Sequence, residues 1–315
     1  MTPMANLNDN IIIHIGFHKT GTSWLQKKFF ENPVTNINSL AKYKERAKWV
    51  TEIIKPFYLY DEAKLLEFIN DSYSDGKLNV FSLERLAGYP STGGYDSLMI
   101  AKRLKSLFPN AKILIGIREQ FSMIKSHYLE YLKANGTARL DELMSPPRFY
   151  LIRNPIFQLE YFFYKDLIEE YDLLFSKENV LVIPYELMSR DPFKYIEYIC
   201  KFLDIPDYED FLNQLPFQER INEKISARDA YLNRTYNRIF GSNNSLVTVT
   251  SNKFFRFLFS TFYKRLPLDF GKKLESEIKH SIESIPSGFF KDSNKLLEKR
   301  MNYHFEVNLQ ELGYY

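Results

Sequence analysis

Hydrophobic positions along the chain alternate between short apolar runs and longer stretches with helical periodicity. The apolar runs are Ile11–Ile15, Leu78–Leu83, Lys112–Ile117 and Asn179–Ile183. The stretches with helical periodicity are about Thr22–Glu31, Asp61–Tyr73, Tyr95–Leu107, Gln120–Lys133 and Ile156–Phe175. Continuous apolar runs are typical of parallel strands that are covered on both faces. The pattern predicts an α/β fold with one parallel β-sheet of about four to five strands flanked by helices. The last third of the chain is predicted to be mostly helical.

Several segments carry more specific expectations. In the helix Gln120–Lys133, an apolar stripe is predicted to face the core, formed by Phe121, Ile124, Tyr128 and Leu132. Cys200 lies on a similar stripe and is predicted to be a core residue. The Lys-rich segment Lys42–Lys48 is predicted to be a solvated helix face. Residues 136–157 contain a glycine, three prolines and three arginines, so they are a candidate lid or acceptor loop.

Composition limits the possible classes of protein. The chain has 315 residues and 45% apolar content, which suits a single α/β domain over residues 1–315. The net charge of +3 argues against a general nucleic-acid-binding protein. One cysteine and five scattered histidines predict no metal site. The first ten residues lack a signal-peptide pattern, and no apolar run approaches the roughly 20 residues that span a bilayer. We therefore expect a soluble, cytoplasmic protein.

The first apolar run leads into the most informative motif of the chain, GFHKTGTSW at residues 16–24. Gly16 and Gly21 permit sharp turns and close approach of the backbone to a ligand. Thr22 and Ser23 stand where a helix N-terminus would begin, with N–H groups that lack intrahelical acceptors. Lys19 adds a full positive charge. This combination predicts a phosphate-binding loop, although an ordinary strand–turn–helix corner is the simpler alternative.

The spacing approaches the nucleotide-binding pattern GxxxxGK[ST], but Thr22 stands where that pattern needs lysine. The arrangement instead resembles the 5′-phosphosulfate loop of sulfotransferases that use 3′-phosphoadenosine 5′-phosphosulfate (PAPS). The resemblance implies a P-loop-like fold and a site that binds PAPS and its product 3′,5′-bisphosphoadenosine (PAP) without a metal. It assigns donor binding to seven loop residues: His18, Lys19, Thr20, Gly21, Thr22, Ser23 and Trp24. For His18, contact with the acceptor or a role in shaping the loop stays open.

A second motif follows the third apolar run. Sulfotransferases carry a pattern like RxPxxRxxSxY, and residues 118–128 read REQFSMIKSHY. The pattern's proline and middle arginine are replaced by Gln120 and Met123. By resemblance, Arg118 and Ser126 bind the 3′-phosphate of the donor. An arginine fork and a hydroxyl are suitable phosphate ligands, whereas a surface salt bridge is the simpler reading of Arg118. The block 180–187, which contains the fourth apolar run, and the C-terminal segments 294–297 and 312–315 are also similar to bacterial members, and we expect Glu186 to be structural.

The candidate base is Glu84, which follows the second apolar run. Ser82-Leu83-Glu84 resembles the SxE setting in which polysaccharide-type and many bacterial sulfotransferases place a catalytic glutamate. The resemblance implies that Glu84 takes a proton from an acceptor hydroxyl while Lys19 neutralises charge on the departing phosphate. The alternative for Glu84 is a structural ion pair with Arg85 or Lys19.

The implied activity is transfer of a sulfonate group from PAPS to a hydroxyl, most readily that of a carbohydrate on a polysaccharide, glycolipid or glycoside. Two alternatives stay open at this point. One is a small-molecule kinase, which would need a lysine at position 22 and Mg²⁺ ligands. The other is a non-catalytic protein that binds sulfonucleotides. The aromatic and basic stretch 253–265 is a candidate for peripheral contact with a membrane surface, with a partly buried helix as the simpler reading.

Overall fold

The fold was determined as a computed structural model, which describes residues 10–42, 45–144, 157–219, 221, 225–240, 261 and 269–314. Contacts divide the chain into two compact units. The first comprises residues 1–120, 159–221 and 290–315, and the second comprises residues 121–158 and 222–289. The single domain expected over residues 1–315 stays a prediction. Most of the predicted lid and of the stretch 253–265 lies outside the described residues.

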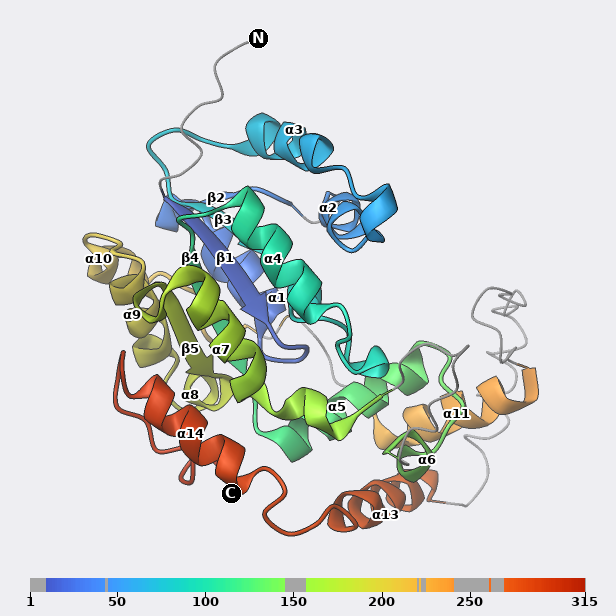
Figure 1. The fold of residues 1–315 in the computed structure, drawn as a ribbon. Helices are drawn as coiled ribbons and strands as arrows, with labels where there is room; N and C mark the ends of the chain where they lie inside the picture. Colours follow the sequence, from blue (N-terminus) through green and yellow to red (C-terminus); the bar gives the residue numbers. More distant parts are fainter. Residues whose placement is uncertain are drawn as a thin grey trace. The chain divides into compact units, whose positions relative to one another are not determined.

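The first unit is built on a five-stranded parallel sheet of order β2-β3-β1-β4-β5 (Figure 1). The strands are β1 (Ile11–Gly16), β2 (Asn38–Ser39), β3 (Asn79–Ser82), β4 (Lys112–Ile117) and β5 (Val180–Pro184). Every residue of β1, β3 and β5 is buried, as the continuous apolar runs predict. The parallel α/β sheet is therefore confirmed, and the two-residue edge strand β2 is an addition that no apolar run signals.

Helices cover both faces of this sheet. In Figure 1, α4 and α7 lie in front of the strands and α1 lies behind them. The helices and helical turns of the first unit are α1 (Thr22–Trp24), η1 (Leu25–Phe30), η2 (Pro33–Thr35), α2 (Arg46–Ile53), η3 (Phe57–Leu59), α3 (Glu62–Ser72), η4 (Glu84–Ala87), η5 (Pro90–Thr92), α4 (Ser97–Leu107), η6 (Leu159–Phe162), α7 (Tyr164–Phe175), η7 (Lys177–Asn179), α8 (Tyr185–Arg190), α9 (Pro192–Phe202), α10 (Tyr208–Leu212) and α14 (Lys291–Met301).

The second unit is helical among its described residues. It contains α6 (Leu140–Met144), α11 (Ala227–Phe240), α13 (Phe270–Glu283) and all of α5 (Gln120–Lys133) but its first residue. Arg234 of α11 links this helix to α5 and α13, because its guanidinium donates to the Tyr128 hydroxyl at 3.0 Å and pairs with Glu277 at 2.6 Å. The mostly helical C-terminal part is confirmed.

Four local expectations need correction. Phe121 is 37% exposed, whereas Met123 is buried beside the other members of the α5 stripe. The helix expected over Ile156–Phe175 is broken at Phe163 into η6 and α7. The helix after β1 is α-helical only to Trp24 and continues as a π-helix. Within the Lys-rich segment, Lys42 and Lys48 are exposed, but Arg46 is buried and pairs with Glu31.

Cys200 is buried as expected, and burial raises the pKa of its thiol to about 12.

Candidate active site

The loop after β1 folds back over the end of its own strand. A Cβ atom on Gly16 would lie 2.3 Å from the Thr22 Oγ1 and 2.9 Å from the Thr20 Oγ1, so only glycine fits there. Lys19 (φ 67°) and Gly21 (φ 81°) both adopt left-handed backbone conformations. The loop is thereby bent into a tight cradle at the carboxyl edge of the sheet, where ligands of open α/β sheets bind.

Two buried threonines hold this cradle in shape. The Thr20 hydroxyl donates to the Phe17 carbonyl at 2.7 Å and lies 3.4 Å from the Thr22 hydroxyl. The helix begins immediately afterwards, since the Trp24 and Leu25 amides donate to the Gly21 carbonyl. The first N–H groups of that helix therefore border the loop, as the sequence predicts for an anion-binding corner.

The structure brings the two predicted cations of the first unit together. Arg118 follows β4, and its Nη1 donates to the Lys19 carbonyl at 3.1 Å. Its guanidinium lies 5.2 Å from the centre of the Tyr185 ring, and its own carbonyl accepts from the Tyr164 hydroxyl at 2.7 Å. Both Lys19 and Arg118 are half-buried. Arg118 is therefore fixed against the loop that follows β1, which disagrees with its reading as a surface salt bridge.

Glu84 follows the neighbouring strand β3 and opens the turn η4, half-buried. Its neighbour Arg85 is held by the buried Asp96, with an Nη1 to Oδ1 distance of 3.3 Å. Among the residues that the structure describes, Glu84 makes no ion pair. The alternative of a structural pair with Arg85 is therefore wrong. Since β3, β1 and β4 are adjacent and parallel, Glu84, Lys19 and Arg118 lie at the same edge of the sheet.

A buried polar network that sequence reasoning missed supports the end of β3. The Gln26 amide, in the π-helix η1, donates to the Ser82 carbonyl at 2.9 Å and accepts from the Arg46 Nη1 at 2.6 Å. The Ser82 hydroxyl bonds to His14 Nδ1 at 2.7 Å. Burial, reinforced by the charge of Arg46, lowers the pKa of His14 to about 3, so the ring is neutral. In the sequence, the sign of this buried polar network was His14, a histidine within a run of isoleucines.

Glu186 has the structural role expected of it. Its carboxylate accepts from the Glu119 amide at 3.0 Å and from the Tyr314 hydroxyl at 3.0 Å, which fixes the backbone next to Arg118. Burial raises the pKa of this carboxyl group. Gln120, at the position of the pattern's proline, is also buried and donates to the Asn294 side chain at 2.6 Å. The C-terminal segment thus braces the turn that carries Arg118.

The structure also describes the other residues that the sequence predicts to bind the donor. Trp24 is buried and stacks on Phe217 with ring centres 5.5 Å apart. His18 is half-buried and contacts the Tyr89 ring at 5.6 Å. Ser23 is half-buried beside the loop. Ser126 is half-buried in α5 and belongs to the second unit, so its pairing with Arg118 stays a prediction.

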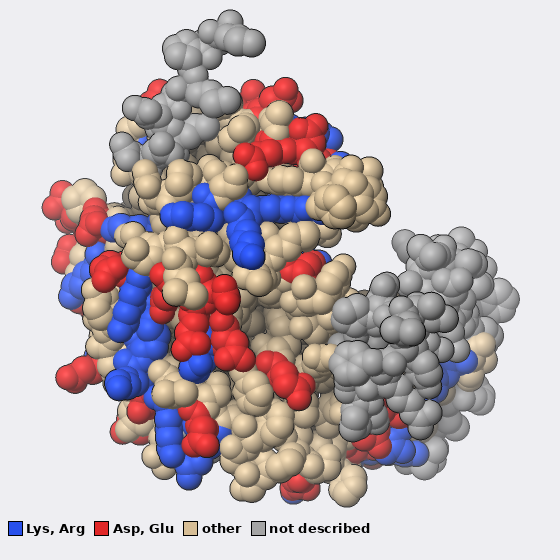
Figure 2. Space-filling view, viewed as in Figure 1, with Lys and Arg blue, Asp and Glu red and all other residues tan. Residues whose placement is uncertain are grey.

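The described part of the chain has neither a candidate metal site nor a candidate membrane span. Residues 10–144 and 157–314, apart from the gaps noted above, contain no cluster of three or more histidine, cysteine or carboxylate ligands. Within the same ranges, no helix is both long and apolar enough to cross a bilayer. On the face shown in Figure 2, a band of Lys and Arg side chains lies next to a group of Asp and Glu side chains.

Comparison with known proteins gives one family. The family model described as a sulfotransferase domain matches residues 8–245. No curated protein sequence matches the chain. Among solved structures, the chain is similar to a sulfotransferase from Alicyclobacillus acidocaldarius, with 19% identity, TM-score 0.48 and coverage of 72% of this chain and 92% of the other.

Two further solved structures are similar to the chain. One is mouse sulfotransferase SULT7A1 complexed with PAP, with 18% identity, TM-score 0.41 and coverage of 87% and 90% of the two chains. The other is the sulfotransferase domain from the curacin biosynthetic pathway, with 14% identity, TM-score 0.38 and coverage of 89% and 98%.

Proposed function

Since this chain belongs to the sulfotransferase family, a PAPS-dependent family of enzymes, we propose that it transfers a sulfonate group from PAPS to a carbohydrate hydroxyl with Glu84 as base. One observation carries the proposal. Glu84, Lys19 and Arg118 follow the carboxyl ends of three adjacent parallel strands, so a carboxylate, a loop cation and a second cation lie at one edge of the sheet. This is where an open α/β sheet binds its ligands.

The loop residues suit the 5′-phosphosulfate end of the donor. The Thr22 hydroxyl lies over Gly16, and the start of a helix borders the loop; this hydroxyl and the first N–H groups of the helix can donate to an anion. Lys19 adds a charge from the same loop. When bound, PAPS supplies a sulfonate group attached to a phosphate that can leave. In our proposal, Thr22, Ser23 and the backbone amides of residues 20–23 hold that phosphate.

The other donor contacts are assigned residue by residue. Arg118, braced by Tyr164, Tyr185 and the Lys19 carbonyl, offers its remaining guanidinium nitrogens to the 3′-phosphate, with Ser126 as its partner. Trp24 contributes an aromatic wall that Phe217 holds in place. His18 and Gly21 shape the loop around the donor.

Glu84 has the properties that a general base needs. It is half-buried at the rim, and no ion pair with a described residue competes for its carboxylate. In the proposed reaction it accepts the proton of the acceptor hydroxyl, while Lys19 stabilises negative charge on the oxygen that leaves sulfur. General acid–base catalysis of this kind contributes roughly 10²–10⁴-fold to a rate.

The rim around Glu84 favours a carbohydrate acceptor. Tyr89 and Tyr95 lie on the loop after η4 and are 37% and 66% exposed. A tyrosine ring offers an apolar face and a polar hydroxyl, which suits a sugar ring with its own apolar face and hydroxyl groups. The contact between Tyr89 and His18 connects this acceptor side to the donor loop.

The test is turnover of labelled PAPS with a panel of sugar and phenol acceptors. Glu84→Gln should retain PAP binding in calorimetry and lose about 10²-fold or more in turnover. Glu67→Gln, the same change at an exposed position of α3, is the matched control and should turn over like the parent. Near-parental turnover of Glu84→Gln would refute the base assignment, and preference for phenols would refute the carbohydrate acceptor.

The two alternatives make different predictions. A kinase would bind ATP–Mg²⁺ more tightly than PAP, but Thr22 occupies the position where it needs lysine. A non-catalytic sulfonucleotide-binding protein would bind PAP and show no transfer to any acceptor. Calorimetry with both nucleotides and the acceptor panel therefore separate all three functions. The cytoplasmic location and peripheral membrane contact inferred from the sequence stay predictions.

A further inference from the structure

Tyr314 is buried against the turn that carries Arg118, within the first unit. Its hydroxyl donates to Glu186 Oε2 at 3.0 Å, and the other oxygen of this carboxylate accepts from the Glu119 amide at 3.0 Å. Glu119 directly follows Arg118 in the chain. The side chain of Tyr314 therefore reaches the turn through a single carboxylate.

The backbone of Tyr314 reaches the same turn by a second route. Its carbonyl accepts from the side-chain amide of Asn294. Asn294 and Gln120 exchange two hydrogen bonds, of 2.6 and 3.2 Å, between their side-chain amides, and both residues are buried. The two routes from Tyr314 therefore end on Glu119 and Gln120, the two residues that follow Arg118.

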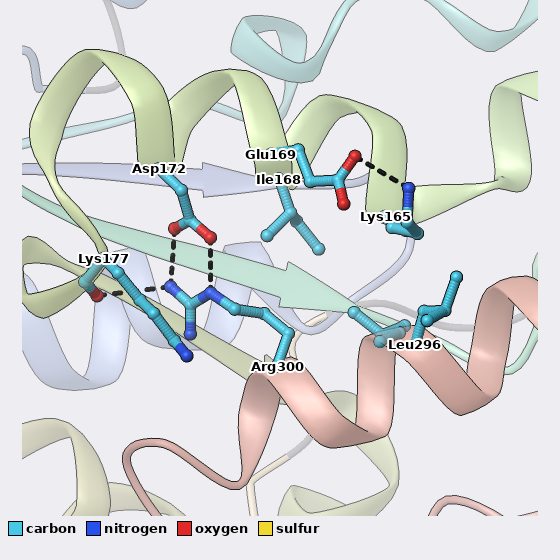
Figure 3. Close-up of a pocket in the computed structure, with 8 residues that line it drawn as sticks. Lys165, Ile168, Glu169, Asp172, Lys177, Leu296 and Arg300 are labelled. Atoms are coloured by element: carbon cyan, nitrogen blue, oxygen red, sulfur yellow. Dashed lines mark hydrogen bonds and ion pairs between the residues drawn. The ribbon is translucent and has the colours of Figure 1, made fainter.

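The helix that supplies Asn294 has an anchor of its own. Figure 3 shows Arg300 of α14 paired with Asp172 of α7, with an Nη2 to Oδ1 distance of 2.6 Å. The same nitrogen donates to the carbonyl of Val180, the first residue of β5, at 2.8 Å. α14 is thus fixed at the amino end of β5. A change in the Tyr314 side chain leaves this anchor in place.

The charge of Glu186 gives Tyr314 a role beyond support of the backbone. Burial raises the pKa of the Glu186 carboxyl group, and the nearby charge of Arg118 lowers it. A carboxylate that paired with Arg118 would compete with a phosphate for the same guanidinium. In the structure, one oxygen of Glu186 is engaged by the Glu119 amide and the other by the Tyr314 hydroxyl. Removal of this hydroxyl would release the second oxygen toward Arg118.

We propose that Tyr314 is a positioning residue for the donor site, which holds Arg118 in the orientation that binds the 3′-phosphate of PAPS. It fixes the turn after Arg118, and it engages the Glu186 oxygen that would otherwise be available to the guanidinium. The inference rests on the 3′-phosphate role that the proposed function gives to Arg118. It assigns a part in donor recognition to a residue outside both donor-binding motifs.

The test is calorimetry of the full chain with PAP and with adenosine 5′-phosphate, which lacks the 3′-phosphate. Tyr314→Phe keeps the buried ring and removes only the hydroxyl. It should weaken PAP binding about fivefold or more and leave binding of adenosine 5′-phosphate unchanged. A general structural role would instead affect both nucleotides. Parental affinity for PAP, or equal losses for the two nucleotides, would overturn the proposal.

Tyr195→Phe is the matched control. Tyr195 is also buried, and the charge of Glu186 contributes, after burial, to the raised pKa of its hydroxyl. This hydroxyl has no hydrogen-bond partner among the described residues. The variant should therefore bind both nucleotides like the parent. A loss of PAP affinity equal to that of Tyr314→Phe would show that the bond to Glu186 is not the cause.

A double-variant cycle shows whether Tyr314 acts through Arg118. Tyr314→Phe should weaken PAP binding in the parent but not in Arg118→Ala, where the residue through which it acts is missing. An undiminished effect in that background would contradict the proposed route. The cycle also separates this inference from the proposed function. If Arg118→Ala weakens both nucleotides equally, the 3′-phosphate role fails and the role of Tyr314 with it. If only Arg118→Ala is selective for PAP, the role of Tyr314 alone fails.

Discussion

Gln26 offers the sharpest test of how the candidate active site is built. This side chain is 4% exposed and connects the helix that begins at Thr22 to the end of β3, the strand that precedes Glu84. Gln26→Leu keeps the approximate volume but removes both hydrogen bonds. It leaves the Ser82 carbonyl without the Gln26 amide and one nitrogen of Arg46 without its acceptor. We expect this change to disturb the position of Glu84 relative to Lys19.

The structure sets the expected magnitudes. A buried polar group that loses its partner costs about 1–3 kcal/mol, so two such groups give a loss of about 2–6 kcal/mol in the free energy of unfolding. Displacement of a catalytic group by about 1 Å can reduce a rate about 10²-fold. We therefore expect kcat to fall by about 10-fold to 10²-fold, while the KM for PAPS changes little because the loop itself is unaltered.

The assay compares kcat and KM with urea unfolding for matched variants. Asn79→Ala is the control, because it removes buried bonds to the Ser74 and Lys77 carbonyls at the opposite end of β3. It should lose comparable stability and keep kcat. Gln26→Glu retains an acceptor for Arg46 but cannot donate to Ser82, so a fall in kcat here isolates that bond. Parental kcat in Gln26→Leu, or an equal loss in Asn79→Ala, would refute the reasoning.

Three further predictions concern single residues. Gly16→Ala should weaken PAP binding in calorimetry about tenfold or more, because its Cβ would lie 2.3 Å from the Thr22 hydroxyl; unchanged affinity would contradict the close packing of the loop. Folded His14 has a pKa of about 3, against about 6.5 when unfolded, so only the unfolded chain gains this proton as the pH falls below 6.5. The free energy of unfolding should then fall by about 1.4 kcal/mol per pH unit, which gives about 2 kcal/mol by pH 5. In urea unfolding, His14→Asn should show a weaker dependence of this free energy on pH. An equal dependence in both proteins would count against a neutral buried ring. Arg118→Ala should weaken binding of PAP far more than that of adenosine 5′-phosphate, and equal losses would exclude a 3′-phosphate role.

Local patterns in the sequence predicted the elements that position the site. Strands β1, β3, β4 and β5 follow from continuous apolar runs, because a strand buried on both faces must be apolar at every position. The tight loop after β1 follows from Gly16 and Gly21, because Gly16 leaves no room for a Cβ atom and Gly21 has a left-handed backbone conformation. The edge position of Glu84 and Arg118 follows from their place directly after parallel strands.

Local patterns failed where burial depends on distant partners. Arg46 lies in a Lys-rich segment that looks solvated, but it is buried because Gln26 and Glu31 meet its guanidinium there. Phe121 fits the helical stripe by spacing, yet it is exposed, whereas Ile124, Tyr128 and Leu132 of the same stripe are buried. Spacing gives the side of a helix on which apolar residues cluster, but the packing partners decide which residues of that side are buried.

The sequence by itself determined the parallel α/β fold, the tight glycine-containing loop after β1 and the residue types at its rim, because strand periodicity, glycine conformation and loop charge are local properties. Only the tertiary structure decided which of these residues are held together and by what. The bond from Arg118 to the Lys19 carbonyl joins residues 99 positions apart in the chain, and the bond from Gln26 to the Ser82 carbonyl joins residues 56 apart. Such contacts form when strands pair side by side, and the pairing order of strands leaves no signal in the local pattern of any one of them.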